Sequence, residues 1–248
     1  CASCGARYIC ADGIWRLLAP ERLAHFAPFL RDYTAIRSAE GYGYEQRERY
    51  QRLPDAPPGD PLAWQWRMRA ITLAALERQV LEPIAGTASD QGTRRETRDF
   101  RDVARVSRLV SHVSGNILNS SQCAPGLRVL DLGAGVSWLC NRLAERGHQP
   151  VAVDLNDDPR DGLGAWRHYD TCWPRIQAEF DRLPLADAQA DLVVYNAALP
   201  YSADYRATLA EGLRVLRPGG RLVVTDSPIY RRDASGRQML AERQAAFE

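Results

Sequence analysis

The stretch Val129-Leu130-Asp131-Leu132-Gly133-Ala134-Gly135 decides the fold of this chain. A short apolar run reaches a carboxylate, then breaks into a turn with two glycines, and residues 138–146 follow with the pattern of a helix. Glycines in such a turn let bare backbone approach a ligand. The stretch therefore predicts a strand, a tight loop and a helix start beside a nucleotide-like ligand.

Strands and helices alternate after residue 127. We expect strands at 128–132, 150–154, 175–180, 192–196 and 221–225. Helices are expected between them, at 138–146, about 162–169 and 205–216. Strands separated by helices indicate parallel crossover units. The expected fold class is therefore α/β, with a Rossmann-like, doubly wound and mostly parallel sheet that carries helices on both faces.

The residues before this alternation favour helices. Apolar residues recur at helical spacing from Pro20 to about residue 36, over 64–81 and over 100–118. We expect three parts: a short amino-terminal segment at 1–18, a helical cap region at 19–118 and a ligand-binding domain at 119–248. Because the chain begins without methionine and Glu248 falls inside an apparent helix, we expect a segment of a longer protein, truncated at its carboxyl end.

Composition sets limits on function. Hydrophobic residues make up 45% and charged residues 25%, which is ordinary for a globular protein. The formal net charge of +1 gives no general attraction to nucleic acid or to an anionic membrane. No apolar run reaches the ~18 residues of a membrane span. Six cysteines without regular spacing suggest a cytoplasmic protein rather than a disulfide framework. All 32 basic residues are arginine, which excludes a lysine Schiff base or P-loop lysine.

Four loops should meet at one edge of the expected sheet. In doubly wound sheets the ligand lies beyond the carboxyl ends of the strands, where strand order reverses. The glycine turn is the first loop, and Asp154 at the next strand end can take both ribose hydroxyls. Glu179 and Phe180 offer a polar group and a flat face for a base, and Asn196 closes the fourth strand. Each signal is weak alone, but together they predict one nucleotide site.

A dinucleotide site fits these residues less well. The dinucleotide-binding loop of dehydrogenases has a third glycine, which allows the helix to pack closely on the strand. Trp138 occupies that position in this chain and is too large for such packing. Asp131, two residues before the first glycine, would also repel a pyrophosphate. It suits a ligand with a positive group instead, such as the amino group of a methionine moiety.

At this point the chain resembles the class I S-adenosylmethionine-dependent methyltransferases, of the type 11-like domain. The resemblance lies in residues 129–135, in Ala152-Val153-Asp154, in 179–185 and 190–199, and in the Arg-Pro-Gly-Gly turn within 213–224. It implies S-adenosylmethionine as cofactor, with Asp131 near its methionine end, Asp154 on the ribose, and Glu179 and Phe180 beside the adenine. The cofactor-binding residues so implied are Asp131, Gly133, Ala134, Gly135, Asp154, Leu155, Glu179, Phe180 and Asn196.

Two departures from the family pattern matter. The family sheet normally ends with two further strands, which this chain lacks after residue 230. The loop after the fourth strand reads Asn-Ala-Ala-Leu-Pro-Tyr from Asn196 to Tyr201 and not Asn-Pro-Pro-Tyr. This difference disfavours methylation of DNA or glutamine. We expect a small-molecule acceptor, and the sequence does not identify it or the oligomeric state.

The amino-terminal cysteines resemble part of a zinc ribbon. Cys1 and Cys4 have the spacing of one zinc knuckle, and residues 8–18 resemble the remainder of the ribbon. A structural zinc site needs four ligands, and only Cys10 lies near. We therefore expect no metal site in this chain as it stands.

The acceptor side offers several candidate catalytic residues. Methyl transfer mainly needs alignment of donor and acceptor, with a base where the acceptor loses a proton. The main candidates are His168, Tyr195, Asn196 and Tyr201, and Tyr169, Asp170, Asp226 and Tyr230 also follow strand ends. His168 is the best base by its ordinary pKa, but its position at a helix end favours an ordinary surface histidine. Residues 37–44 could form a lid over the acceptor, or Gly41 could simply cap a helix.

The sequence thus favours a methyltransferase. A non-catalytic relative that binds the cofactor or a protein partner stays open, as does a nicotinamide-dependent reductase. The intact Asp131, Gly133, Gly135 and Asp154 favour cofactor binding.

Overall fold

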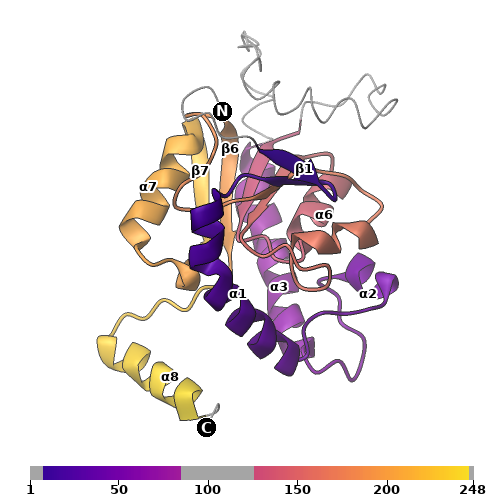
Figure 1. Cartoon of the computed structure of the whole chain (residues 1–248), viewed down its shortest axis with the longest axis vertical. Helices are drawn as coiled ribbons and strands as arrows, with labels where there is room; N and C mark the ends of the chain where they lie inside the picture. The colour runs from indigo at the N-terminus through magenta and orange to yellow at the C-terminus, as the bar shows by residue number, and fades with distance from the viewer. Residues whose placement is uncertain (1–7, 85–125, 246–248) are drawn as a thin grey trace.

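The computed structural model describes residues 8–84 and 126–245 (Figure 1). Within these residues, one seven-stranded sheet has the order β1-β2-β5-β4-β3-β6-β7. Its strands are β1 (Ile9–Ala11), β2 (Ile14–Arg16), β3 (Arg128–Leu132), β4 (Gln149–Asp154), β5 (Arg175–Gln177), β6 (Ala190–Asn196) and β7 (Leu216–Thr225). All neighbours pair in parallel except β1 with β2, so the predicted α/β fold class is confirmed.

Helical elements connect the strands and cover both faces of the sheet (Figure 1). They are α1 (Pro20–Ala39), α2 (Arg47–Arg52), α3 (Ala63–Leu76), the π-helical turn η1 (Glu77–Leu81), α6 (Trp138–Glu145), the 3₁₀ helices η2 (Leu163–His168) and η3 (Leu199–Tyr201), α7 (Tyr205–Val215) and α8 (Asp233–Ala245). The helix predicted over 100–118 lies outside the described residues.

Alternation along the strands produces two cores, one on each face of the sheet. Val129 and Val194 point to the face that α3 and α6 cover, where Trp66 and Leu139 join them. Leu130 and Val193 point to the opposite face, which α7 covers. Successive side chains of a strand point to opposite faces of the sheet. Both faces of a buried parallel strand therefore carry apolar side chains.

Some predicted boundaries needed correction. The third predicted strand ends at Gln177 rather than 180, and the helix predicted over 162–169 is a 3₁₀ helix. The last predicted strand begins at Leu216, because Pro218 and the two following glycines continue an irregular register against β6. None of the helices in the described ranges is sufficiently long and apolar to cross a bilayer.

The amino-terminal hairpin belongs to the main sheet. β1 and β2 pair antiparallel, and β2 then pairs in parallel with β5 through Trp15 and Arg16. Cys10 is exposed and free there, while Cys1 and Cys4 lie outside the described residues. Among the residues that the structure describes, no group of three His, Cys, Asp or Glu side chains could hold a metal ion.

Candidate functional site

Strand order reverses between β3 and β6, at the centre of the sheet. The chain moves outward from β3 through β4 and β5 on one side, and from β6 to β7 on the other. Such a switch point leaves a crevice beyond the carboxyl ends of the two central strands. The structure has a cavity of about 1000 Å³ there, lined by the ends of β3, β4 and β6 and by residues of α1 and α3.

The glycine turn after β3 brings backbone to the cavity. Gly133 has a φ of +77°, and a Cβ atom there would lie 2.4 Å from Cβ of Ala198. The amides of Gly133 and Ala134 donate to the carbonyl of Val153 at 2.8 and 3.1 Å, which fixes the turn against β4. Gly135 has a φ of +52°, and a Cβ atom there would meet no other atom within 4 Å. The turn is therefore tight on its protein side and open on its cavity side.

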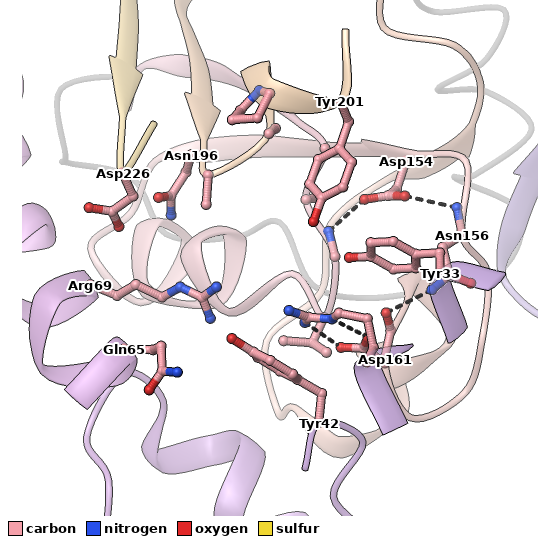
Figure 2. Close-up of a pocket in the computed structure, with 18 of the residues that line it drawn as sticks. Tyr33, Tyr42, Gln65, Arg69, Asp154, Asn156, Asp161, Asn196, Tyr201 and Asp226 are labelled. Atoms are coloured by element: carbon pink, nitrogen blue, oxygen red, sulfur yellow. Dashed lines mark hydrogen bonds and ion pairs between the residues drawn. The ribbon is translucent and has the colours of Figure 1, made fainter. Parts of the chain in front are cut away.

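Asp154 connects the first two loops. Its carboxylate accepts hydrogen bonds from the amide of Gly135 at 2.7 Å and from the amide of Asn156 at 2.8 Å (Figure 2). Burial raises the pKa of Asp154, while those backbone amides act to lower it. The carboxylate lines the cavity and holds two loops at once.

Asp131 is a buried carboxylate with an unused oxygen. It is 1% exposed, Sγ of Cys140 lies 3.5 Å from Oδ2, and Oδ1 has no hydrogen-bond partner in the described structure. Burial raises the pKa of Asp131 to about 7, and the nearby charge of Asp154 adds to this effect. A buried acceptor without a donor is costly, so a cationic or hydrogen-donating ligand would stabilise it.

The remaining sheet loops add an aromatic ring and an amide. The edge of Phe180 packs on Tyr195, with centroids 5.9 Å apart, and Phe180 lines the cavity. Asn196 also lines it, and its Oδ1 accepts from Oγ1 of Thr225 at 3.3 Å. The structure thus brings eight of the nine predicted cofactor residues to one cavity. These are Asp131, Gly133, Ala134, Gly135, Asp154, Leu155, Phe180 and Asn196.

Glu179 is the exception. Both of its oxygens accept from the guanidinium of Arg22 in α1, at 2.8 and 2.5 Å, and it does not line the cavity. The residue beside Phe180 therefore fastens α1 to the sheet in this structure. Its ion-pair partner lies 157 positions away in sequence, and no local pattern signals such a pair.

Two of the four main catalytic candidates lie away from the cavity. His168 stacks on Tyr50 with ring centroids 4.2 Å apart, and burial lowers its pKa. Tyr195 is fully buried and its hydroxyl donates to the carbonyl of Thr208 at 2.9 Å. Asn196 and Tyr201 do line the cavity. Of the secondary candidates Asp226 and Tyr230 line it, whereas Tyr169 and Asp170 do not.

The helical cap supplies cavity residues that the motifs did not indicate. Tyr33 of α1 lies beside Asp154, and its ring meets Tyr201 edge-on at 5.5 Å (Figure 2). Arg37, at the other end of α1 from Arg22, forms a two-pronged ion pair with Asp161 at 2.7 Å. The helical spacing of apolar residues in 20–36 was the available signal for Tyr33, because it marked one face of a helix.

The segment predicted as either a lid or a helix cap ends α1 at Gly41 and then continues along the cavity. The amide of Gly41 donates to the carbonyl of Ser38 and that of Tyr42 to Arg37, which is the Schellman arrangement at a helix end. Gly41 has a φ of +90°, which favours glycine there. Tyr42 and Tyr44 then form part of the cavity wall.

Fold and cavity define a Rossmann-like α/β protein with a ligand site at its switch point. Residues 130–224 match the family model described as a methyltransferase domain. The demethylmenaquinone methyltransferase of Mycobacterium sp. (strain KMS) is 41% identical over 102 residues, covering 41% of this chain and 42% of that relative. The malonyl-[acyl-carrier protein] O-methyltransferase of Hahella chejuensis is 37% identical over 98 residues, covering 38% and 34%.

A solved S-adenosylmethionine-dependent methyltransferase from Mesorhizobium loti is 31% identical. The match covers 40% of this chain and 46% of that one, with a TM-score of 0.37. The chain spans less than half the length of these curated relatives. The matched family segment runs from β3 to β7, and β1, β2 and the cap helices α1 to α3 lie outside it.

Proposed function

We propose that this chain is an S-adenosylmethionine-dependent methyltransferase that acts on a small-molecule acceptor. The observation that carries the proposal is the meeting of Asp131, Gly135 and Asp154 in one cavity at the switch point. The match of residues 130–224 to a methyltransferase domain supports it independently.

The residues present fit this cofactor. The unpartnered Oδ1 of Asp131 would accept from the amino group of its methionine end. The open side of Gly135 would allow the ligand to touch backbone, and Asp154 would accept from the ribose hydroxyls with its remaining lone pairs. Phe180 would contact the adenine face. The two buried carboxylates suit a positively charged ligand better than a pyrophosphate.

The cofactor would supply an activated methyl group on a sulfonium centre. The residues of the chain would therefore mainly orient the cofactor and the acceptor and enclose them. Asn196, Tyr201 and Asp226 line the part of the cavity where an acceptor would meet the methyl group. Helix α1 lines the cavity with Phe29 and Tyr33, and a bound cofactor beneath these rings would be partly shielded from water. Alignment of the reacting atoms then supplies much of the rate enhancement.

A small acceptor fits the size of the cavity and the charge of the chain. Ligand cavities span roughly 300–1,000 Å³, so about 1000 Å³ leaves room for cofactor and acceptor together. The net charge of +1 gives no basis for binding nucleic acid. The zinc-ribbon part of the resemblance depends on Cys1 and Cys4, which lie outside the described residues, and stays a prediction.

Titration calorimetry with S-adenosylhomocysteine tests the proposal. We expect saturable binding with one site per chain, and weaker or no binding of NADH. A non-catalytic scaffold with a closed cavity would give no heat with either ligand. A reductase would bind NADH instead. Either result would overturn the proposal.

A further inference from the structure

Helix α3 forms the wall of the cavity on the acceptor side. The cavity is lined by Leu62, at the start of α3, and by Gln65, Trp66 and Arg69 of the helix, where Arg69 follows Gln65 by four residues and Trp66 by three. One turn further, Oγ1 of Thr72 donates to Oδ1 of Asp226 at 2.6 Å. This bond fastens α3 to the end of β7, so the wall is held in place.

Arg69 brings a positive charge into the cavity without a carboxylate partner. Its guanidinium carbon lies 4.4 Å from the ring centroid of Trp66 and 5.9 Å from that of Tyr42. The guanidinium points into the cavity, with Gln65 on one side and Asn196 and Asp226 on the other (Figure 2). Among the described residues it forms no hydrogen bond or ion pair.

Other arginines around the cavity differ from Arg69 in this respect. Arg37 pairs with Asp161, and Arg49, whose guanidinium also lies over Trp66, pairs with Asp60 at 2.7 Å. Glu40 and Asp226 line the same cavity, but in the described structure neither forms an ion pair with Arg69. The guanidinium of Arg69 therefore contacts aromatic rings, and its N–H groups face the cavity.

An open, half-buried guanidinium selects a planar oxyanion. Its parallel N–H groups match the two oxygens of a carboxylate, and such charge-assisted pairs are stronger and more directional than neutral hydrogen bonds. Gln65, one turn before Arg69, can add an amide donor from the same helix face. Asp226, on the other side of the guanidinium (Figure 2), would repel an anion, so the anionic end of a ligand would lie on the Gln65 side of Arg69.

We propose that Arg69 and Gln65 form a subsite for a carboxylate on the methyl acceptor, and that this acceptor is a flat aromatic acid. The flat body is inferred from the rings of Tyr33 and Tyr42, which line the cavity and are partly exposed. With its carboxylate on Arg69, the acceptor presents its uncharged end toward Asn196. The assignment of the ligand as acceptor rests on the proposed methyltransferase function.

The test compares 1-naphthoate with 1-naphthamide, which share a flat body and differ in charge. Titration calorimetry in the presence of S-adenosylhomocysteine should show at least tenfold tighter binding of the acid to the unaltered chain. Arg69→Met should remove this preference and leave the amide affinity unchanged. Arg69→Lys should keep part of it, because a charge remains without the fork. Arg67→Met is the matched control, since Arg67 is exposed on the same helix and does not line the cavity.

Equal binding of acid and amide to the unaltered chain would overturn the subsite, and so would a preference that survives Arg69→Met. Gln65→Ala gives a second test that keeps the ring contacts of Arg69. It should weaken the binding of the acid and leave the binding of the amide unchanged. If S-adenosylhomocysteine does not bind but the acid preference is present, the methyltransferase proposal fails and the anion subsite stands. If S-adenosylhomocysteine binds but the acid is not preferred over the amide, the anion subsite fails and the methyltransferase proposal stands.

Discussion

The two sides of the cavity are built in different ways. The sheet side consists of short loops at strand ends, where backbone amides and glycines fix the geometry, as between Gly135 and Asp154. The helical side consists of α1 and α3, and α1 contains no buried residue along its whole length. Two arginine–carboxylate pairs attach α1, Arg22 with Glu179 and Arg37 with Asp161. A site can thus combine a fixed floor with a cover that depends on a few charges.

If the cover depends on its ion pairs, Arg37→Met should have the largest effect. It would leave the carboxylate of Asp161, 7% exposed, without its guanidinium partner. Breaking one partner of a buried pair costs about 3–5 kcal/mol. We expect faster hydrogen exchange in 29–39 and weaker binding of S-adenosylhomocysteine. Arg31→Met, on the exposed side of α1, is the control. Unchanged exchange rates would show that other contacts hold the helix.

Because the loops on the sheet side are tightly packed, a side chain at Gly133 should lower the free energy of unfolding. A second glycine with a positive φ but no close neighbours provides the comparison. Gly133→Ala combines a positive φ with a Cβ contact at 2.4 Å, whereas Gly59 has a φ of +82° and open space around it. Conformational strain of about 1–2 kcal/mol applies to both, and crowding should add about 1–3 kcal/mol at Gly133 alone. Urea unfolding of the two variants measures the difference. Equal destabilisation would mean that Ala198 moves aside freely.

Asp154→Ala, compared with the loss of a charge elsewhere, tests whether Asp154 contributes to ligand binding through its hydrogen bonds. The change removes the acceptor of two loop amides and of the ribose hydroxyls, so binding of S-adenosylhomocysteine should weaken by about 1–3 kcal/mol. Asp187→Ala removes an equal charge at a side chain that is 77% exposed, and should have no effect on binding. An unaltered affinity for the Asp154 variant in calorimetry would refute the ribose assignment.

A further expected effect is a pH dependence that arises from Asp131. Its pKa is raised to about 7 in the folded chain, above the ordinary value of 3.8. Its contribution to stability is therefore complete below the unfolded pKa and is lost as pH rises toward about 7. Affinity for S-adenosylhomocysteine should change oppositely, rising by up to about tenfold per pH unit between pH 5 and 7 as the carboxylate ionises.

Asp131→Asn checks this assignment, because Asp154 also has a raised pKa and faces the same cavity. The amide that replaces the carboxylate cannot ionise, so both pH slopes should flatten. Slopes that persist in this variant would assign the titration to Asp154 or to another group.

The sequence predicted the floor of the site far better than its cover. The strand that ends at Leu132, the glycine turn and the start of α6 are all local patterns, and they lie as predicted. The attachment of Glu179 to Arg22 was missed, because it joins residues 157 positions apart. Arg69 was missed for a related reason. Its importance comes from the absence of a counterion among its described neighbours, which only the folded arrangement reveals.

Tertiary packing also places two of the candidate catalytic residues away from the cavity. His168 has the best ordinary pKa for a base, but stacking on Tyr50 keeps it out of the cavity. Tyr195 follows the strand alternation to the opposite face from Asn196, where its hydroxyl bonds to α7. Period two places neighbours on opposite faces, and that rule could have excluded Tyr195 before the structure was known.

The pairing of β2 with β5 has a consequence for biosynthesis. Trp15 and Arg16 pair with Ile176 and Gln177, and the amide of Leu17 donates to the carbonyl of Gln177 at 3.0 Å. A ribosome delivers the amino-terminal residues first, so residues 14–17 must wait until β5 has been translated before they find their neighbour. Contacts this distant in sequence slow folding. The nascent hairpin and α1 should therefore be the segments that chaperones protect during translation.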